Sequence, residues 1–275
     1  MIKIDNLGFS YGSTPVLEHI TMTLEDGRIY GLLGENGVGK TTLLTLLCGL
    51  KNAGQGSVCI DGCNPYKRQP SLLQSVYYLP DEVMPYNQTG TRFARYAGSF
   101  WPGFDYDKFL KIMREFETDP EKKMNKMSAG QLKKTYIAFA LACNTKYLFM
   151  DEPTNGLDIP SKAQFRKAVG LYTSEDSTIV ISTHQVRDLE NIIDPIIILD
   201  RCDVLMNATI EEITEKLYFD YGTTLRQEAL YSEQLPGGFI QVLMNTEGLE
   251  SKVNIEALFN AVHRHKDLIK RMFNK

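Results

Sequence analysis

The stretch GENGVGKT, residues 34–41, decides the fold because it fits the pattern GxxxxGK[ST]. It lies between an apolar run at residues 28–33, which predicts a buried strand, and residues 40–50, which favour a helix. Successive backbone N–H groups can surround a chain of phosphates only where side chains stay small, and the helix adds its own free N–H groups and positive dipole end. The stretch therefore predicts a loop that binds the phosphates of a nucleotide.

Individual residues of this loop have distinct expected roles. Lys40 supplies a positive charge for the outer phosphates, and the Thr41 hydroxyl is placed to hold Mg²⁺. The alternative is a glycine-rich turn that binds nothing, but the spacing, the lysine, the threonine and the place in the chain all match a phosphate loop. The residues expected to contact the nucleotide here are Gly34, Glu35, Asn36, Gly37, Val38, Gly39, Lys40, Thr41 and Thr42.

Two acidic residues follow a second apolar run. Asp151 and Glu152 come directly after Leu148-Phe-Met150, at the carboxyl end of an expected strand, where open parallel sheets bind their ligands. Asp151 is expected to bind Mg²⁺, directly or through water, and Glu152 to polarise the attacking water as general base. Alone, the pair could equally end the strand and face solvent, but the phosphate loop upstream favours the catalytic interpretation.

Short apolar runs elsewhere indicate the rest of the fold. Residues 147–150, 179–181 and 196–199 are strongly apolar, and such strands with helices between them predict a parallel sheet covered on both faces. Residues 1–33 predict three strands, with a hairpin turn at Asp26-Gly27. The predicted fold class is therefore α/β.

The pattern changes after about residue 203. Thr209-Ile-Glu-Glu212 is a capping-box sequence that predicts the start of a helix, and residues 239–244 predict a strand. Asn254 is expected to cap one last helix, whose apolar positions are Ile255, Leu258, Phe259, Val262, Ile269 and Phe273. We divide the chain into a main domain, residues 1–202, and a small α/β extension, residues 203–275, for which the sequence indicates no role.

Composition excludes several classes of protein. The 275 residues include 30 basic and 34 acidic side chains, a net charge of −4, and 43% hydrophobic residues, which is the balance of an ordinary globular protein rather than a disordered one. No apolar run approaches the roughly 18–20 residues that span a bilayer, and the first residues lack the apolar core of a signal peptide. Five scattered cysteines without a CxxC pair favour a reducing, cytoplasmic setting.

Further motifs narrow the class of nucleotide-binding protein. Met127-Ser-Ala-Gly-Gln131 precedes a helical stretch and resembles the signature sequence of ATP-binding cassette (ABC) ATPases, usually Leu-Ser-Gly-Gly-Gln. Thr154-Asn-Gly-Leu-Asp158 resembles the D-loop of that family, and Ser182-Thr-His184 resembles its switch histidine. The motifs follow the family's order over about residues 1–205. This resemblance implies a P-loop NTPase fold with a mainly parallel core sheet, an antiparallel β subdomain and a helical insert at about residues 82–142.

The resemblance also implies that two chains share each nucleotide. In the family, the signature helix belongs to the opposite subunit, so that two ATP molecules lie between the chains of a head-to-tail dimer. The residues expected to contact the γ-phosphate at this helix N-terminus are Ser128, Ala129, Gly130 and Gln131. For Ser128, an ordinary N-cap is the alternative.

Other roles carry over position by position. His184 is expected to contact the γ-phosphate and help to orient the water, and Asp158 to link the two sites across the dimer, which is compatible with capping the helix that starts near Pro160. Tyr11 occupies the position of the aromatic residue that stacks on adenine, with Val16 nearby.

Two positions depart from the family's pattern. The family usually has a glutamine that contacts Mg²⁺ after a strand of the type Tyr-Leu-Pro, and here Asp81 follows Pro80. Asp81 could still coordinate the metal, although a solvent-facing loop acid is the alternative. Ala129 replaces the first glycine of the signature; alanine keeps the backbone N–H, so phosphate binding is expected to survive.

The helical insert is the part through which family members meet their membrane partners. It contains Phe100-Trp-Pro-Gly-Phe104, with Tyr96 and Tyr106 nearby. An exposed aromatic patch would suit a docking surface. We favour the alternative, in which several of these rings form the small core of the insert.

The function implied by the resemblance is that of an Mg²⁺-dependent ATPase that converts ATP to ADP and phosphate. The chain is expected to be the motor subunit of an ABC transporter, pairing with itself or a related cassette. It would drive a separate transmembrane permease from the inner face of the cell membrane, without direct nucleic-acid binding. The alternatives are a soluble cassette ATPase that acts on ribosomes or nucleic acid, and a regulatory module that binds ATP with little hydrolysis.

Overall fold

A six-stranded sheet lies at the centre of the computed structural model, which describes residues 1–273. Its strands, in spatial order, are β5 (Val76–Leu79), β6 (Tyr147–Asp151), β7 (Thr178–Thr183), β3 (Ile29–Leu33), β8 (Ile196–Asp200) and β9 (Asp203–Ala208). The first five run parallel to one another, and β9 is antiparallel to β8. This confirms the predicted α/β class with a mainly parallel core sheet.

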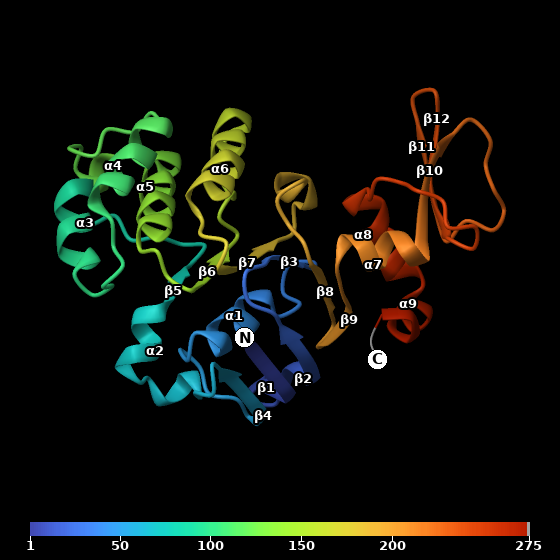
Figure 1. The fold of residues 1–275 in the computed structure, drawn as a ribbon, viewed down its shortest axis with the longest axis horizontal. Helices are drawn as coiled ribbons and strands as arrows, with labels where there is room; N and C mark the ends of the chain where they lie inside the picture. Colours follow the sequence, from blue (N-terminus) through green and yellow to red (C-terminus); the bar gives the residue numbers. More distant parts are fainter. Residues whose placement is uncertain (274–275) are drawn as a thin grey trace.

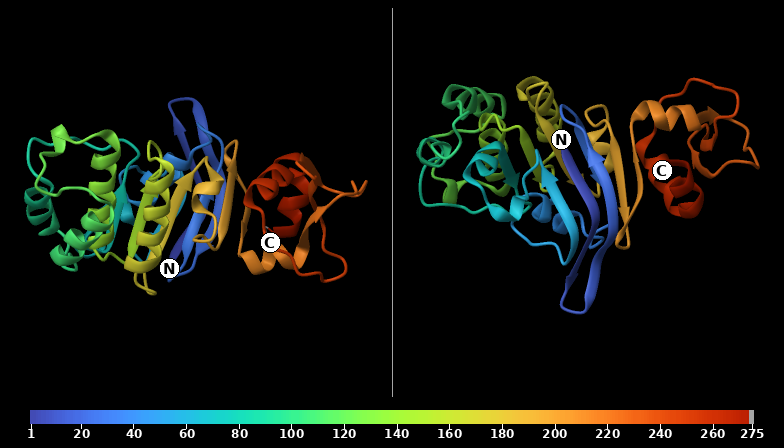
Figure 2. Two further views of the ribbon diagram at one scale, coloured as in Figure 1. Left: turned by 90° about the horizontal axis from the view of Figure 1, so that it is seen from above. Right: turned by 60° about the horizontal axis from the view of Figure 1, so that its bottom comes forward.

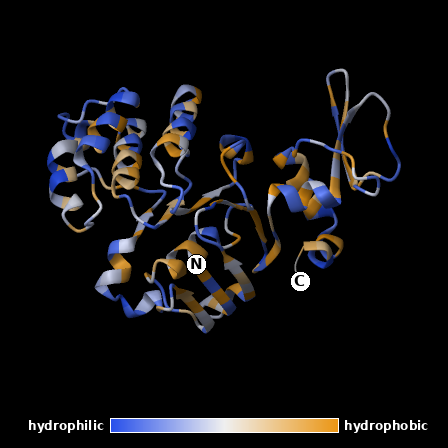
Figure 3. Ribbon diagram, viewed as in Figure 1, coloured by the Kyte–Doolittle hydropathy of each residue, from blue (hydrophilic) through white to orange (hydrophobic). Residues whose placement is uncertain are grey.

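Helices cover both faces of this sheet. Figure 1 shows α1 (Lys40–Leu47) below the sheet and α6 (Ile159–Tyr172) above it. Because both faces are covered, β6, β7 and β8 are buried along their whole length, which explains their nearly continuous hydrophobic sequences. Figure 3 shows this concentration of hydrophobic residues in the central strands.

An antiparallel sheet packs beside the core, as predicted. Its order is β2-β1-β4, formed by β1 (Ile2–Tyr11), β2 (Thr14–Leu24) and β4 (Gln55–Ile60). The hairpin predicted at Asp26-Gly27 is wrong, because β2 pairs with β1 whereas β3 pairs with β7 and β8. Asp26 forms an ion pair with the Met1 amino group, and the Gly27 N–H donates to Thr178 Oγ1 at 3.2 Å, so the turn joins two sheets.

The helical insert lies at one end of the core sheet, on the left in Figure 1. Its elements and the short helices that precede it are η1 (Pro65–Lys67), α2 (Pro70–Ser75), α3 (Gly90–Gly98), α4 (Tyr106–Glu115), η2 (Met124–Lys126) and α5 (Ala129–Ala142). Trp101 packs against Phe139, with ring centroids 5.9 Å apart, but Phe100 is 61% exposed. The aromatic segment therefore supplies both a core ring and a surface ring.

The C-terminal extension forms a separate group at the opposite end, to the right in both views of Figure 2. It contains α7 (Ile210–Lys216), β10 (Leu217–Gly222), β11 (Tyr231–Leu235), β12 (Gly238–Met244), α8 (Ile255–Arg264) and α9 (Lys266–Phe273). Its sheet is antiparallel, in the order β10-β12-β11. Thr209 and Glu212 form the predicted capping box at the start of α7.

Two expectations for this region are corrected. The last helix is two helices, because His265 leaves the helical conformation and its Nε2 lies 2.8 Å from the Leu230 carbonyl oxygen. In addition, residues 203–208, which the sequence assigns to the extension, form β9, and β9 pairs with β8 at the edge of the core sheet. The extension therefore leaves the core after Ala208. In residues 1–273, no helix is long and apolar enough to span a bilayer.

Candidate active site

The phosphate loop connects β3 to α1 in a conformation that needs its glycines. Gly37 and Gly39 have φ angles of 86° and 108°, in the left-handed region that L side chains rarely adopt. A Cβ atom on Gly34 would lie 2.6 Å from the Leu199 carbonyl oxygen. Within the described chain, no side chain caps the N-terminus of α1, so its first N–H groups stay available for an anion.

Lys40 lies inside this loop, 6% exposed. Its Nζ donates to the carbonyl oxygens of Gly34 and Glu35, at 2.8 and 3.0 Å, and lies 3.3 Å from Glu152 Oε1. The structure thus places the Lys40 ammonium group beside Glu152, the expected general base.

The side-chain oxygens of Thr41 and Asp151 lie close enough to bind one metal ion together. Thr41 Oγ1 donates to Asp151 Oδ2 at 2.6 Å, and a hydroxyl and a carboxylate oxygen are the hard ligands that Mg²⁺ prefers. Two neighbours orient the carboxylate: Ser182 Oγ donates to Oδ1, and Tyr78 Oη donates to Oδ2 at 3.3 Å. The donor set therefore fits a magnesium ion beside the phosphate loop.

Glu152 occupies a strained position directly after β6. Its φ angle is 44°, and its backbone N–H donates to the Ser182 carbonyl oxygen at 3.1 Å. Oε1 is buried and has no hydrogen-bond partner among the described residues, apart from the ionic contact with Lys40. Oε2 lies 3.0 Å from His184 Nδ1 and accepts a hydrogen bond from the His184 backbone N–H at 3.3 Å. Loops after two neighbouring strands thus bring the two expected catalytic side chains into contact.

Asp81 has different neighbours from those expected of a metal ligand. Lys133 Nζ, on α5, lies 3.2 Å from Asp81 Oδ1, and the Asn155 side-chain amide lies 3.3 Å from both carboxylate oxygens. In this structure the Asp81 carboxylate is therefore held by Lys133 and Asn155. Sequence reasoning missed Lys133, because it is 52 positions from Asp81 and belongs to no motif.

The residues expected around adenine lie close to the phosphate helix. Tyr11 is 51% exposed, and its hydroxyl lies 3.4 Å from Thr42 Oγ1, on α1. A Cβ atom on Gly39 would lie 3.1 Å from Val16 Cγ1, so this valine borders the loop. Lys51 Nζ lies 4.8 Å from the centre of the Tyr11 ring and covers one of its faces. An aromatic face therefore lies beside the phosphate loop, as adenine stacking requires.

The signature segment begins α5. Ser128 accepts a hydrogen bond from the Gln131 N–H at 3.2 Å, and Gln131 Oε1 accepts one from the Ser128 N–H at the same distance, a capping box. A Cβ atom on Gly130 would lie 3.9 Å from the Gly156 carbonyl oxygen, in the loop that follows Glu152. Asp158 caps α6 by accepting from the Ser161 N–H at 3.0 Å.

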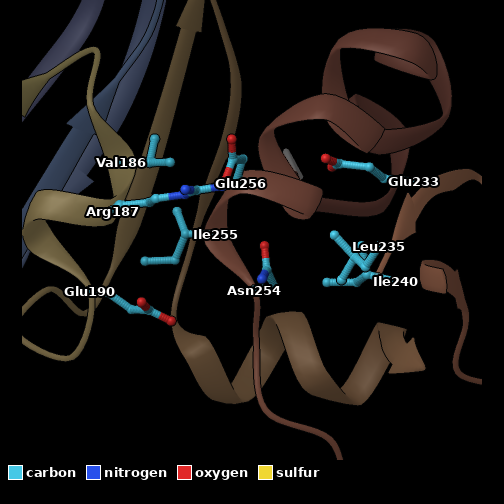
Figure 4. Close-up of a pocket in the computed structure, with 9 residues that line it drawn as sticks. All are labelled: Val186, Arg187, Glu190, Glu233, Leu235, Ile240, Asn254, Ile255 and Glu256. Atoms are coloured by element: carbon cyan, nitrogen blue, oxygen red, sulfur yellow. Dashed lines mark hydrogen bonds and ion pairs between the residues drawn. The ribbon is translucent and has the colours of Figure 1, made fainter. Parts of the chain in front are cut away.

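The segment after His184 connects the site to the C-terminal extension. In the 3₁₀ helix η3 (Val186–Leu189), Asp188 accepts a hydrogen bond from Thr154 at 2.9 Å, and Arg187 Nε donates to Glu256 of α8 at 2.6 Å. Figure 4 shows the Arg187–Glu256 pair at a cavity of about 200 Å³ between η3 and the extension. The extension therefore contacts the segment that follows His184.

Replacing Tyr78 with phenylalanine tests the support of Asp151. The change removes one donor to the carboxylate without removing the ring, and a hydrogen bond to a charged group is worth roughly 1.5–3 kcal/mol. We expect the Mg²⁺ concentration for half-maximal ATPase activity to rise about tenfold, measured by Mg²⁺ titration at saturating ATP. Tyr66→Phe, an exposed tyrosine on η1, is the matched control. An unchanged Mg²⁺ requirement in Tyr78→Phe would contradict this assignment.

Comparison with known proteins agrees with this geometry. The family model described as ABC transporter matches residues 17–155. The chain is 27% identical to the ABC transporter ATP-binding protein YtrB of Bacillus subtilis (strain 168) over 261 residues, covering 92% of this chain and 89% of YtrB. It is 29% identical to the lantibiotic transport ATP-binding protein SrtF of Streptococcus pyogenes, covering 70% of this chain and 84% of SrtF.

Solved structures share the fold. The ATP-binding subunit of an ABC transporter superposes with a TM-score of 0.69 at 24% identity, covering 78% of this chain and 91% of that one. A dimeric ATP-binding cassette bound to ADP and Pi gives a TM-score of 0.66 at 21% identity, with 76% and 98% covered. Because the family model covers half of the chain, including residues 34–41 and 151–152, this protein belongs to the ABC transporter family and resembles its ATP-binding proteins.

Proposed function

We propose that this chain is the ATP-hydrolysing subunit of an ABC transporter. The observation that carries the proposal is the convergence of Lys40, Glu152 and His184 beside the phosphate loop. This arrangement can bind a triphosphate, accept a proton from an attacking water and stabilise the charge that develops on the terminal phosphate. The relatives' descriptions as ATP-binding proteins support the same activity.

In the proposed reaction, Glu152 accepts the proton of the water that attacks the γ-phosphate. Its strained backbone and its contact with His184 orient the carboxylate before the reaction, so little reorganisation is needed. Lys40 neutralises the outer phosphates, and the backbone N–H groups of residues 34–42 surround them. Tyr11 and Val16 hold the base and ribose next to the loop.

Magnesium binding is proposed at Thr41 and Asp151, whose oxygen atoms are already adjacent. Bound there, Mg²⁺ would neutralise phosphate charge and orient the terminal phosphate. Ser182 and Tyr78 keep the Asp151 carboxylate turned toward Thr41. Asp81, whose carboxylate contacts Lys133 and Asn155 in this structure, is proposed as a further ligand.

The active unit is proposed to be a head-to-tail dimer of this chain or of this chain with a related cassette. Figure 1 shows α5 in the helical insert and α1 below the core sheet, so the signature residues and the phosphate loop lie on separate parts of the molecule. Ser128, Ala129, Gly130 and Gln131 are therefore proposed to contact the nucleotide held by the partner, and Asp158 to lie at the dimer contact. The dimeric fold neighbour supports this arrangement.

The proposed permease-docking site is an apolar groove between the core and the insert. Its volume is about 460 Å³, and its walls are Cys48, Leu50, Arg68, Pro70, Leu73, Gln74, Val76, Tyr78, Phe100 and Trp101. Leu50 and Phe100 are 51% and 61% exposed, which is costly for a surface that meets only water. A cytoplasmic helix of a permease is the occupant that fits the family, and it would place this chain at the inner face of the membrane.

Phe100→Asp tests the docking proposal. A charge in the centre of an apolar contact must be desolvated without a partner, so we expect co-purification with the permease to be lost while ATPase activity of the isolated chain stays within about twofold. Leu171→Asp, which changes an equally exposed residue of α6 outside the groove, is the control. Retained co-purification of Phe100→Asp would contradict docking at this groove.

A further inference from the structure

A buried lysine and the aspartate that it contacts link three segments around the candidate active site. Lys133 of α5 is 4% exposed, and its Nζ donates to the Asp81 carbonyl oxygen at 2.5 Å and to Asp81 Oδ1 at 3.2 Å. The Asn155 amide reaches both oxygens of the same carboxylate at 3.3 Å. Asp81 is thus the shared partner of the signature helix and of the loop that follows Glu152.

An ammonium group buried to this extent is tolerated only when it is paired. Burial lowers the pKa of Lys133, and the Asp81 carboxylate opposes this shift, as do the charges of Asp151 and Glu152 more weakly. The Lys133–Asp81 contact therefore compensates a buried charge at the catalytic edge of the sheet. Only the lysine is buried, because the Asp81 side chain is 39% exposed.

The signature segment lies next to this contact. Gly130, in the first turn of α5, is close to the carbonyl oxygen of Gly156, and Gly156 follows Asn155 directly in the chain. Lys133 is one turn further along the same helix. The contacts of Asp81 with Lys133 and Asn155 therefore connect the first two turns of α5 to the loop that follows Glu152.

We propose that Lys133 is a positioning residue for ATP hydrolysis, which holds the tip of α5 and its Ser128 at a fixed place relative to the catalytic edge through Asp81. The inference rests on the proposed function, in which Ser128 contacts the nucleotide of the partner. It assigns to Asp81 a structural tie in the state in which its carboxylate contacts Lys133 and Asn155. Neither residue needs to touch the nucleotide for the tie to act.

A double-mutant cycle on the full chain tests the tie. Lys133→Met and Asp81→Asn are each expected to lower kcat about tenfold, below the hundredfold that a 1 Å displacement can cost. The double variant is expected to be no slower than either single variant, because both changes break the same contact. Monomer affinity for a fluorescent ATP analogue stays within about twofold of wild type, whereas more ATP is needed to form the dimer in a Glu152→Gln background.

The neighbouring lysine is the matched control. Lys134 donates to the Phe116 carbonyl oxygen at 3.2 Å within the insert, so Lys134→Met removes a lysine from the same helix without touching the tie. Its kcat is expected to stay within about twofold of wild type, and Lys133→Arg is expected to recover most of the activity lost in Lys133→Met.

The outcomes separate the inference from the function on which it rests. If the wild type is active and Lys133→Met has the wild-type kcat, the inference alone is overturned. It is also overturned if the losses in kcat of the two single variants multiply in the double variant, because that would indicate independent roles. A wild-type chain that hydrolyses no ATP overturns both. If Lys133→Met fails to fold, the test uses the double variant, in which both charges are removed together. A double variant with the kcat of the wild type would overturn the proposed tie.

Discussion

Glu152→Gln is expected to lower kcat for ATP hydrolysis by about a thousandfold, within the 10²–10⁴ that general bases contribute, while ATP still binds. The amide keeps the size of the side chain and its place between Lys40 and His184, but it cannot accept a proton from water. Because binding survives and turnover fails, ATP should accumulate in a stable dimer. Phosphate release and size-exclusion chromatography with ATP measure the two effects.

Glu250→Gln is the control for this experiment, since it removes an exposed carboxylate in the C-terminal extension. Its turnover and its dimerisation are expected to match those of the wild type. Two results would contradict the assignment of Glu152: a variant that keeps more than about a tenth of the wild-type kcat, or one that no longer binds ATP. The first result would show that Glu152 is not the general base. The second would indicate that its role is structural.

Lys40→Ala is expected to weaken nucleotide binding about a hundredfold. The Lys40 ammonium group is buried at the phosphate loop, and charge-assisted hydrogen bonds to phosphate are worth roughly 1.5–3 kcal/mol. The substitution also leaves the buried Glu152 Oε1 without its ionic partner. Isothermal titration calorimetry with a non-hydrolysable ATP analogue measures the loss directly.

Lys167→Ala, an exposed lysine of α6, is the control for Lys40→Ala and is expected to bind nucleotide as the wild type does. Thermal unfolding without nucleotide checks that the Lys40 variant is folded, because both loop carbonyls lose a donor. If a folded Lys40→Ala protein bound the analogue with wild-type affinity, the loop formed by residues 34–41 would not be the phosphate site.

Some candidate site residues could be predicted from the sequence because their chemistry depends on local spacing. Residues 34–41 must follow one another for the loop to close around phosphate, and Asp151 and Glu152 must end a strand together, so both appear as contiguous motifs. The capping boxes of α5 and α7 are local for the same reason. Tyr78, Ser182 and Lys133 act through residues distant in the chain, and no sequence spacing marks such contacts.

The errors in the fold prediction have a related cause. A turn such as Asp26-Gly27 is compatible with a hairpin, but whether two strands pair depends on which other edges are available. Here β7 and β8 offer buried edges to β3, and β2 pairs with β1 instead. Similarly, β9 follows β8 after a turn and pairs with it, although the sequence change near residue 203 indicated a domain boundary.

The sequence by itself determined the nucleotide-binding class, the α/β fold and the polar residues at the ends of β3, β6 and β7, because each follows from residues that are neighbours in the chain. Only the tertiary structure decided which partners these residues have. It placed Lys40 beside Oε1 of Glu152 and His184 beside Oε2. It also paired Asp81 with Lys133. Long-range pairs of this kind depend on the packing of whole helices and strands, which no local pattern specifies.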